Sequence, residues 1–352
     1  MSNKKDIRLL EFLEIQCFCK SNGLPNFRAK QVWEWLWKKK ATSFKEMTSL
    51  SKQIRDLFTL HFTINPIKIY KAERSIDGTI KYSLQLQDKL LIESVLIPSK
   101  KRLTACISSQ VGCSLTCNFC ATGTLKLDRN LTTAEIYDQV FILNEEAISN
   151  FGKPLSNIVY MGMGEPLVNY QNVVDSVKYI INKDGLNISS KRITLSTVGV
   201  SKMIRKLADE ELKINLAVSL HSANNVKRTK IMDINSVNDL DDLKNALIYF
   251  FNKTKIKITY EYIMLKDFND TKKDALDLIK FCKIIPSKVN LIEFNTVKKT
   301  NFMKSSDIIT KEFIEILKKE KIIVNLRKSR GEDVNAACGQ LANTTDSFEK
   351  NH

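Results

Sequence analysis

The sequence contains no long hydrophobic run. No uncharged stretch approaches the roughly 18 consecutive apolar residues that a membrane-spanning helix needs. The N-terminus, Met1 to Arg8, carries charges where a secretory signal peptide would need an apolar segment. We therefore expect a soluble, cytoplasmic protein with no membrane partner.

Acidic residues are few beside basic ones. The 352 residues include 39 Asp and Glu against 55 Lys and Arg, a formal net charge of +16 at pH 7. Such an excess favours a polyanionic partner, because each phosphate that is neutralised releases counterions. A biased genome can also enrich Lys, Asn and Ile, so charge alone leaves nucleic-acid binding open. The 43% hydrophobic content excludes global disorder.

The first third of the chain predicts three helices. The first spans Asp6–Asn22, the second begins near Asn26, and a capping box of Ser43 and Glu46 predicts a third that ends at Phe58. The apolar face expected on the first helix is Leu9, Phe12, Leu13 and Cys17. Basic residues surround the tryptophans of the second helix: Arg28, Lys30, Lys38, Lys39 and Lys40. They form either a solvated face or an RNA-docking face.

Strand signals follow, at first without helices between them. A turn at Asp77-Gly78 precedes Lys81–Gln87, where apolar and polar residues alternate strictly, and Leu90–Pro98 is a second strand. From Thr104 onward strands alternate with helices. The expected strands are Asn157–Met161, Arg192–Ser196, Ile214–Leu220, Lys257–Met264, Val289–Phe294 and Ile322–Leu326, and Thr132–Ile148 is a capped helix in the same region. This alternation predicts an α/β fold with a parallel sheet, closed or partly closed as a barrel, and active residues at the carboxyl ends of its strands.

These patterns divide the chain into four parts. We expect an N-terminal helical accessory domain that binds RNA (1–62), a β extension (63–103), a barrel core (104–341) and a polar tail (342–352).

Cysteines are the strongest local signal. The eight are Cys17, Cys19, Cys106, Cys113, Cys117, Cys120, Cys282 and Cys338. In a cytoplasmic protein, clustered thiols indicate metal binding or catalysis rather than disulfides. The spacing C-x-x-x-C-x-x-C lets Cys113, Cys117 and Cys120 ligate three corners of an iron–sulfur cubane and leaves one iron open. The alternative is a zinc site completed by Cys106, although zinc usually takes two separated pairs. We interpret Cys17, Cys19 and Cys282, which have apolar neighbours, as small core residues.

This loop, with Phe119 before its last cysteine, resembles the signature of the radical S-adenosylmethionine superfamily. Four longer segments are similar to one branch of it, the RlmN family, which methylates carbon 2 of adenine in both 23S rRNA and tRNA. They are Leu24-Pro-Asn-Phe-Arg-Ala-Lys-Gln-Val-Trp-Glu-Trp-Leu-Trp37, Cys106-Ile-Ser-Ser-Gln-Val-Gly-Cys113, Met161-Gly-Met-Gly-Glu-Pro166 and Asn335-Ala-Ala-Cys338-Gly-Gln. The resemblance therefore covers essentially the whole chain. It implies the partial (β/α) barrel of the radical S-adenosylmethionine type, with an N-terminal helical domain and a small β extension.

The resemblance also implies cofactors and partners. We expect one 4Fe-4S cluster on Cys113, Cys117 and Cys120, with S-adenosylmethionine both as methyl donor and as source of a 5′-deoxyadenosyl radical. The implied substrates are the adenine 2503 class of 23S rRNA, in the peptidyl transferase centre, and adenine 37 of tRNAs. A reductase or flavodoxin-type protein would supply electrons, and a monomer is expected.

Individual roles follow from the same resemblance. Cys338 would carry the methyl group, Cys106 would release the RNA by a transient disulfide with Cys338, and Glu93 would accept the ring proton. Sequence cannot show whether the two cysteines are close. Glu93 lies in an apolar run, so burial would raise its pKa, or it faces water from an edge strand. The expected S-adenosylmethionine contacts are Gly164, Glu165, Ser196, Ser219, Leu220, His221 and Asn295. The alternative for His221 by itself is a hydrogen-bonded core residue.

Three other functions remain open. A related branch methylates carbon 8 of the rRNA adenine and confers antibiotic resistance, and Pro166 after Gly-Met-Gly-Glu favours carbon 2. A zinc-stabilised RNA-binding module would leave Gly164-Glu165 and Cys338 unexplained. A different radical reaction on a protein or metabolite would not explain the basic charge.

Overall fold

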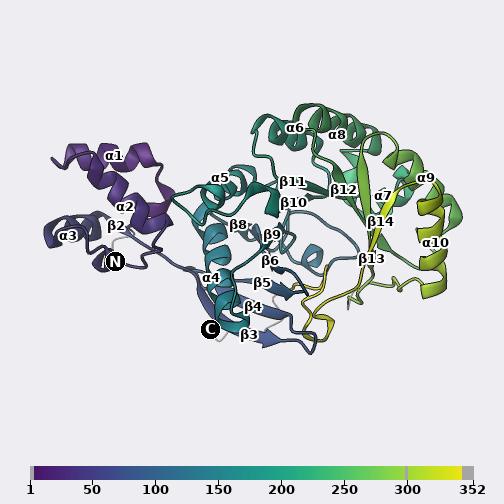
Figure 1. The fold of residues 1–352 in the computed structure, drawn as a ribbon, viewed down its shortest axis with the longest axis horizontal. Coiled ribbons are helices and arrows are strands. Elements are labelled where there is room, and N and C mark those ends of the chain that lie inside the picture. Colours follow the sequence, from purple (N-terminus) through teal and green to yellow (C-terminus); the bar gives the residue numbers. More distant parts are fainter. Residues whose placement is uncertain (1–3, 298–299, 343–352) are drawn as a thin grey trace.

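A computed structural model of the chain, which describes residues 4–297 and 300–342, shows three parts in a row (Figure 1). A helical N-terminal domain lies at one end, a parallel sheet with its helices at the other, and an antiparallel extension between them. No helix within the two described ranges is long and apolar enough to cross a membrane. The predicted polar tail lies outside the described residues except for Ala342.

The N-terminal domain contains α1 (Phe12–Ser21), α2 (Phe27–Trp37) and α3 (Lys52–His61). Its short elements are β1 (Lys5–Asp6), η1 (Ile7–Leu9), η2 (Phe44–Glu46) and β2 (Phe62–Thr63). The start at Asn26 is confirmed, but the other two predicted starts are wrong. Ser43 does contact Glu46 at 3.0 Å, yet that contact closes a single 3-10 turn, and the true cap of α3 is Ser51.

The buried face of α1 also differs from the prediction. The helix buries Ile15 and Cys19, whereas Leu9, Leu13 and Cys17 are exposed. Cys17 is therefore not a core residue, while Cys19 and Cys282 are. The helical period was correct and the face was wrong, because the partner that covers a helix is set by tertiary packing.

The antiparallel extension consists of β3 (Lys68–Arg74), β4 (Ile80–Gln85) and β5 (Leu91–Pro98). It joins the parallel sheet through β6 (Leu103–Cys106), giving one ten-stranded sheet in the order β14-β13-β12-β11-β10-β9-β6-β5-β4-β3. One face of the extension packs on α4, where Tyr82 donates a 2.9 Å hydrogen bond to Glu146. The other face meets the C-terminal loop, so β4 and β5 are buried on both faces, whereas β3 at the edge is largely exposed.

The remaining strands run parallel to β6, as predicted. They are β9 (Asn157–Tyr160), β10 (Ile193–Thr197), β11 (Asn215–Ser219), β12 (Ile258–Met264), β13 (Ser287–Glu293) and β14 (Ile323–Arg327). Each predicted strand in this region agrees to within two residues. Both ends of the sheet stay open within the described residues, which makes the fold a partial (β/α) barrel.

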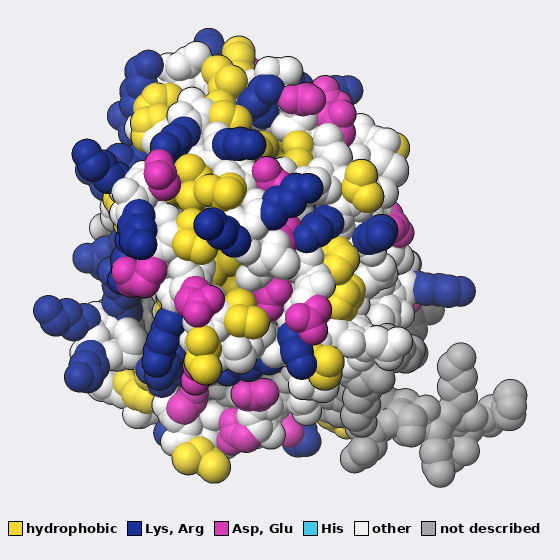
Figure 2. Space-filling model, turned by 90° about the vertical axis from the view of Figure 1, so that its right-hand side faces the viewer, with side chains coloured by type: hydrophobic (Ala, Val, Ile, Leu, Met, Phe, Trp, Pro, Cys, Tyr) yellow, Lys and Arg dark blue, Asp and Glu magenta, His cyan; other side chains and the backbone are white. Residues whose placement is uncertain are grey.

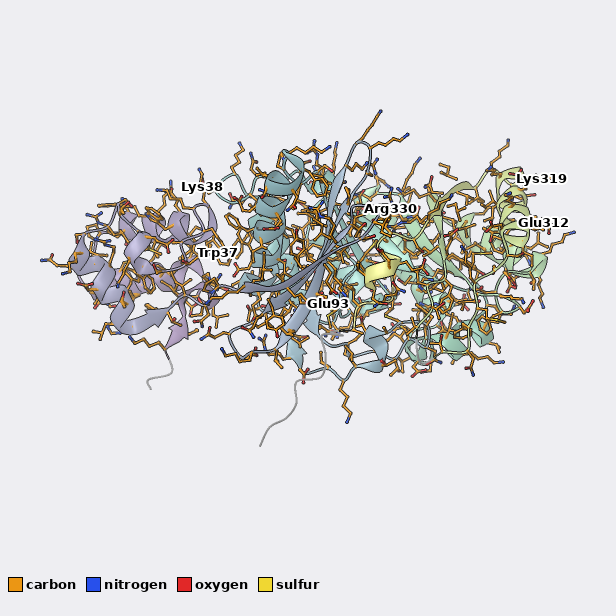
Figure 3. All side chains as sticks on the ribbon, turned by 90° about the horizontal axis from the view of Figure 1, so that it is seen from below. Trp37, Lys38, Glu93, Glu312, Lys319 and Arg330 are labelled. Atoms are coloured by element: carbon orange, nitrogen blue, oxygen red, sulfur yellow. The ribbon has the colours of Figure 1, made fainter. Side chains whose placement is uncertain are left out.

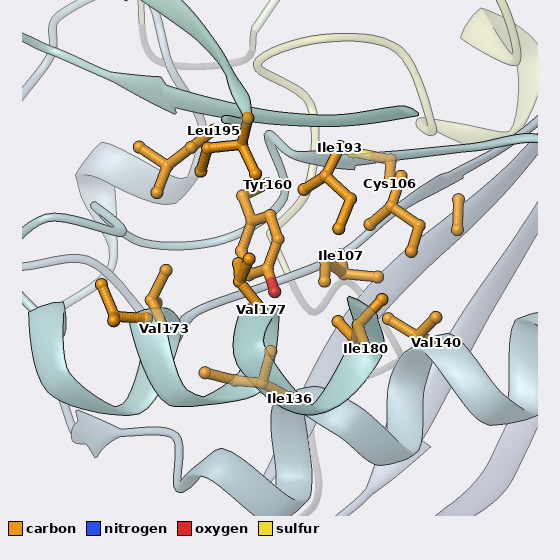
Figure 4. Close-up of a cluster of buried hydrophobic side chains, with 14 of the residues drawn as sticks. Cys106, Ile107, Ile136, Val140, Tyr160, Val173, Val177, Ile180, Ile193 and Leu195 are labelled. Carbon is orange, nitrogen blue, oxygen red and sulfur yellow. The ribbon is translucent and has the colours of Figure 1, made fainter. Parts of the chain in front are cut away.

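Helices cover the outside of the parallel strands (Figure 1). They are α4 (Thr133–Phe151), α5 (Tyr170–Ile181), α6 (Ser201–Asp209), α7 (Asn225–Ile231), α8 (Leu240–Thr254), α9 (Lys272–Cys282) and α10 (Asp307–Lys319). Smaller elements are β7 (Gln110–Val111), β8 (Arg129–Asn130), η3 (Thr122–Thr124), η4 (Ser190–Arg192), η5 (Asp233–Ser236) and η6 (Glu332–Val334). Figure 4 shows apolar side chains of α4 and α5, such as Val140 and Val177, against Ile107, Tyr160 and Leu195 of the sheet side. This packing fixes the strands whose ends carry the site.

A buried group of charges joins the N-terminal domain to α4. Arg8 donates hydrogen bonds of 2.9 Å to both carboxylate oxygens of Asp138 and pairs with Asp6 at 3.0 Å. Lys40 also pairs with Asp138, and its burial lowers its pKa well below the usual value. Lys40 is therefore not part of a surface basic face, although neighbouring Lys38 is exposed beside buried Trp37 (Figure 3).

Replacing Asp138 with Ala should lower the free energy of unfolding by about 3–5 kcal/mol, because two buried cations then share one carboxylate. Urea denaturation would measure the loss. Lys40→Met is the matched control and should cost clearly less, since burial already disfavours its charge. Equal losses in both variants would contradict this account of the domain junction.

Candidate active site

Two adjoining cavities lie at the carboxyl ends of the parallel strands. The first has a volume of about 160 Å³ and is lined by the ends of β9, β10, β11 and β12. The second, of about 130 Å³, lies toward β6 and the C-terminal loop. Seven residues line both: Cys120, Met161, Gly162, Ile292, Arg327, Cys338 and Gly339. Both cavities thus lie at the strand ends, where the sequence predicted active residues.

The three-cysteine loop packs against α7 and the C-terminal loop. Asn118 donates its backbone N–H to Ile231 at 3.0 Å, and Ala121 donates to the carbonyl of Gly339 at 2.7 Å. Gly123 is required here, because an added Cβ would lie 2.9 Å from the backbone nitrogen of Cys117. The loop therefore places Cys120 at the wall of both cavities.

The three thiols influence one another electrostatically. Burial raises the pKa of Cys113 to about 11 and that of Cys117 well above its usual value, and the neighbouring thiols add to both shifts. Within the described ranges, no three His, Cys, Asp or Glu side chains are arranged to hold a metal ion. Thiols with raised pKa values lose their protons when they bind positively charged metal ions. Three such cysteines on one loop are therefore suited to bind the iron ions of an iron–sulfur cluster.

Gly164 and Glu165 follow β9 and line the first cavity. Gly164 has φ +90°, and an added Cβ would lie 2.4 Å from Cβ of Gln110. Glu165 is buried, and its carboxylate accepts N–H groups of Leu167 at 3.1 Å and Val198 at 2.9 Å. Burial raises the pKa of Glu165 to about 7. A buried carboxylate facing a cavity is suited to an ammonium ligand.

Three more predicted cofactor residues line the same cavity: Ser196, Ser219 and His221. His221 accepts the N–H of Ile263 at Nδ1 over 3.1 Å, and burial lowers its pKa to about 3. The imidazole is therefore neutral and hydrogen-bonded, and it still faces the cavity. Leu220 does not line it; its carbonyl accepts from Arg228 at 3.1 Å.

Cys106 and Cys338 are brought together at the second cavity. Cys106 ends β6, and Cys338 lies in the C-terminal loop. Burial raises the pKa of Cys106 to about 12, and the charge of Cys338 adds to this shift. Both thiols are free. Cys338 has solvent-accessible surface and lines both cavities. The protein groups around its thiol raise its pKa, and the positive charge of Arg327 partly opposes that rise.

Asn295 and Glu93 lie behind the C-terminal loop. Asn295 lines the second cavity rather than the first and donates to the carbonyl of Cys338 at 3.2 Å. Glu93 lines neither cavity: it is buried on β5, and its Oε2 accepts the N–H of Ala342 at 2.9 Å. The edge-strand alternative for Glu93 is wrong, because β5 lies between β4 and β6. Figure 3 shows Glu93 on the extension in the middle of the molecule.

The sequence interpretation missed an ion pair that lines the first cavity. Glu261, buried on β12, pairs with Arg327 at the end of β14 over 3.4 Å. The signal for Glu261 was present, since an acid within the apolar run of β12 is the same pattern that drew attention to Glu93. Arg327 had no such signal, because a basic residue after a strand is common on surfaces.

Comparisons with known proteins give consistent results over almost the whole chain. The model of the radical SAM superfamily matches residues 107–282, and that of the "Ribosomal RNA large subunit methyltransferase N-terminal domain" matches residues 7–64. The "Probable dual-specificity RNA methyltransferase RlmN" of Christiangramia forsetii is 54% identical over 340 residues, covering 97% of both chains. The protein of the same name from Dictyoglomus turgidum is 42% identical over 96% of both chains.

A solved structure agrees with these relatives. The radical SAM methyltransferase from Sphaerobacter thermophilus superposes with a TM-score of 0.89 at 34% identity, covering 96% of this chain and 99% of that one.

Proposed function

The chain belongs to the RlmN family of dual-specificity RNA methyltransferases in the radical SAM superfamily, and from that premise we propose that it methylates carbon 2 of adenine in 23S rRNA and in tRNA. Membership of this superfamily gives it a 4Fe-4S cluster and S-adenosylmethionine as cofactors. The observation that best supports the specific reaction is the position of Cys338, which lines both cavities. One cavity is lined by five of the seven predicted cofactor contacts, and the other is lined by Cys106.

In this proposal the first cavity binds S-adenosylmethionine beside the cluster. Cys113, Cys117 and Cys120 hold the cluster, and the carboxylate of Glu165 accepts the ammonium group of S-adenosylmethionine. Gly164 would allow close backbone approach, and Ser196, Ser219 and His221 would be the other contacts in this cavity. Leu220 lines neither cavity and Asn295 lines only the second, so we do not propose a direct contact for these two. The bound cluster and S-adenosylmethionine supply the methyl group and the one-electron chemistry.

The chain's own residues then handle the methyl group. Ordinary polar transfer fails at carbon 2 of adenine, which is a poor nucleophile, so a protein carrier is needed. The thiolate of Cys338 accepts a methyl group, and Arg327 favours that thiolate. After the methyl carbon has joined carbon 2, Glu93 accepts the ring proton. The thiolate of Cys106 then attacks the sulfur of Cys338 and forms a disulfide, while the S–C bond breaks and its electron pair stays with the carbon attached to carbon 2. That carbon takes up a proton, which completes the methyl group and frees the RNA.

The RNA would enter through the second cavity. That cavity is lined by Lys328 and Arg330 as well as Arg327, and these cations suit the phosphates that flank a base. The N-terminal domain would add a second RNA contact. We further propose a monomer in the cytoplasm that receives electrons from a reductase or flavodoxin-type donor.

Nucleoside mass spectrometry tests the proposed position of methylation. Protein purified without oxygen would be incubated with a reductant, S-adenosylmethionine and a 23S rRNA fragment or a tRNA, alongside a Cys117→Ala control. We expect 2-methyladenosine in both RNAs and none with the control. Formation of 8-methyladenosine would assign the chain to the carbon-8 branch and contradict the proposal.

A further inference from the structure

A row of alternating charges crosses one face of the β extension. Glu73 on β3 is directly opposite Lys81 on β4, and Lys81 is directly opposite Val95 on β5. Glu93 lies two residues before Val95, and Cys106 on β6 pairs with Val95. Directly opposed residues and alternate residues of a strand share a face. Glu73, Lys81, Glu93 and Cys106 therefore share the face that meets the C-terminal loop.

The charged groups in this row are in contact. The ammonium group of Lys81 lies 3.6 Å from Oε1 of Glu93 and 3.2 Å from Oε2 of Glu73. The side chains of Glu93 and Lys81 are 1% and 4% exposed, whereas that of Glu73 is 31% exposed. The row thus leads from the buried carboxylate to one that water reaches.

The surroundings of Lys81 contain unused hydrogen-bonding capacity. The buried hydroxyl of Ser83, two residues after Lys81 and on the same face, has no hydrogen-bond partner among the described residues. Ser83 is also directly opposite Glu93. A hydroxyl here can bridge the 3.6 Å separation of Lys81 and Glu93 during proton transfer.

We propose that Glu93, Lys81 and Glu73 form a proton path that carries the proton taken from the RNA base out to water, with Lys81 as the positioning and relay residue. The inference rests on the proposed function, in which Glu93 is the proton acceptor. The C–H proton passes to the Glu93 carboxylate, and the electron pair of that bond stays with the base. Lys81 gives a proton to Glu73, takes the proton of Glu93 in return, and Glu73 releases its proton to water.

The charge state of Glu73 is consistent with this exit. Partial burial would raise its pKa, but hydrogen bonds and charges from Lys71 and Lys81 outweigh burial and lower it. A carboxyl group with a lowered pKa does not retain the proton that it receives. The buried pair of Lys81 and Glu93 is thereby reset for the next turnover.

The test compares release of RNA from Cys338 in single-turnover reactions, followed on denaturing gels. Lys81→Arg keeps the positive charge but cannot release a proton, since guanidinium stays protonated. We expect Lys81→Arg and Lys81→Met to carry normal methylation of Cys338 and to release RNA about tenfold or more slowly. Glu73→Gln, at the exposed end, should slow release at least about threefold without affecting folding.

Lys68→Gln is the matched control, because Lys68 is an exposed lysine at the other end of β3, where it lies opposite Gln85 rather than Lys81. Its release rate should equal that of the wild type. Release from Lys81→Arg at the wild-type rate would overturn the proposal and leave Lys81 as a counter-charge only. A wild-type protein with no methyl group on Cys338 and no RNA adduct would instead show failure of the proposed function itself, and the relay with it.

Discussion

Replacing Cys338 with Ala should abolish RNA methylation, with a loss on the order of 10⁴-fold or more, because the reaction then has no methyl carrier. S-adenosylmethionine binding and cluster content should stay near wild type, since Glu165 and the three-cysteine loop are unchanged. Methylated adenosine, bound S-adenosylmethionine and iron would be measured on the same preparation.

Two further cysteine variants sharpen this result. Cys17→Ala changes an exposed thiol on α1 and should have full activity. Cys106→Ala should still methylate Cys338 but retain RNA as a covalent adduct, because the thiol that attacks Cys338 is missing. Appreciable RNA methylation by the Cys338→Ala protein would show that the methyl group does not pass through this residue.

Replacing Glu165 with Gln should weaken S-adenosylmethionine binding by about 100-fold, because the amide cannot pair with an ammonium group. Burial raises the pKa of Glu165 to about 7, so the wild-type carboxylate is mostly protonated at pH 6 and mostly ionised at pH 8. Wild-type affinity should therefore rise about tenfold between these pH values, whereas that of Glu165→Gln should stay flat. Equilibrium dialysis with labelled S-adenosylmethionine would measure both.

The same pKa shift affects the stability of the protein without ligand. A carboxyl group whose pKa rises on folding favours the folded state below its unfolded pKa of 4.5, and that contribution is lost as pH rises toward 7.

Glu312→Gln on α10 is the matched control for the binding experiment with Glu165→Gln, since Glu312 is exposed. Figure 2 shows the face on that side of the molecule, where Lys and Arg mingle with Asp and Glu. If the affinity of the wild type for S-adenosylmethionine did not change between pH 6 and pH 8, the proposed ammonium contact would be contradicted.

Much of the site was predictable because its residues follow strands. Ser196 and Ser219 lie at the ends of β10 and β11, and Gly164 and Glu165 lie in the loop that follows β9. Parallel strands bring their carboxyl ends to one edge of the sheet. The proximity of Cys106 and Cys338 was not predictable. It depends on a loop 232 residues away in sequence, held by Asn295 and by the cysteine loop.

The wrong predictions concern residues whose surroundings are set by a part of the chain that is distant in sequence. Lys40 belongs to a basic stretch in sequence, yet Asp138 of α4 draws it into the domain junction. The α1 face was misassigned because apolar residues lie on two sides of that helix, and packing buries the side with Ile15 and Cys19. The environment of Glu93 likewise depends on Lys81 and Ala342, from another strand and from the C-terminal loop.

The most direct test of the account asks whether Cys338 carries a methyl group. Tryptic digestion of protein isolated without oxygen yields a peptide from Gly331 to Lys350, in which Cys338 is the only cysteine. Mass spectrometry should find one thioether methyl on this peptide in the wild type and none in Cys117→Ala, prepared in parallel. An unmethylated Cys338 in wild-type protein that holds a full cluster and binds S-adenosylmethionine would contradict the methyl-carrier mechanism.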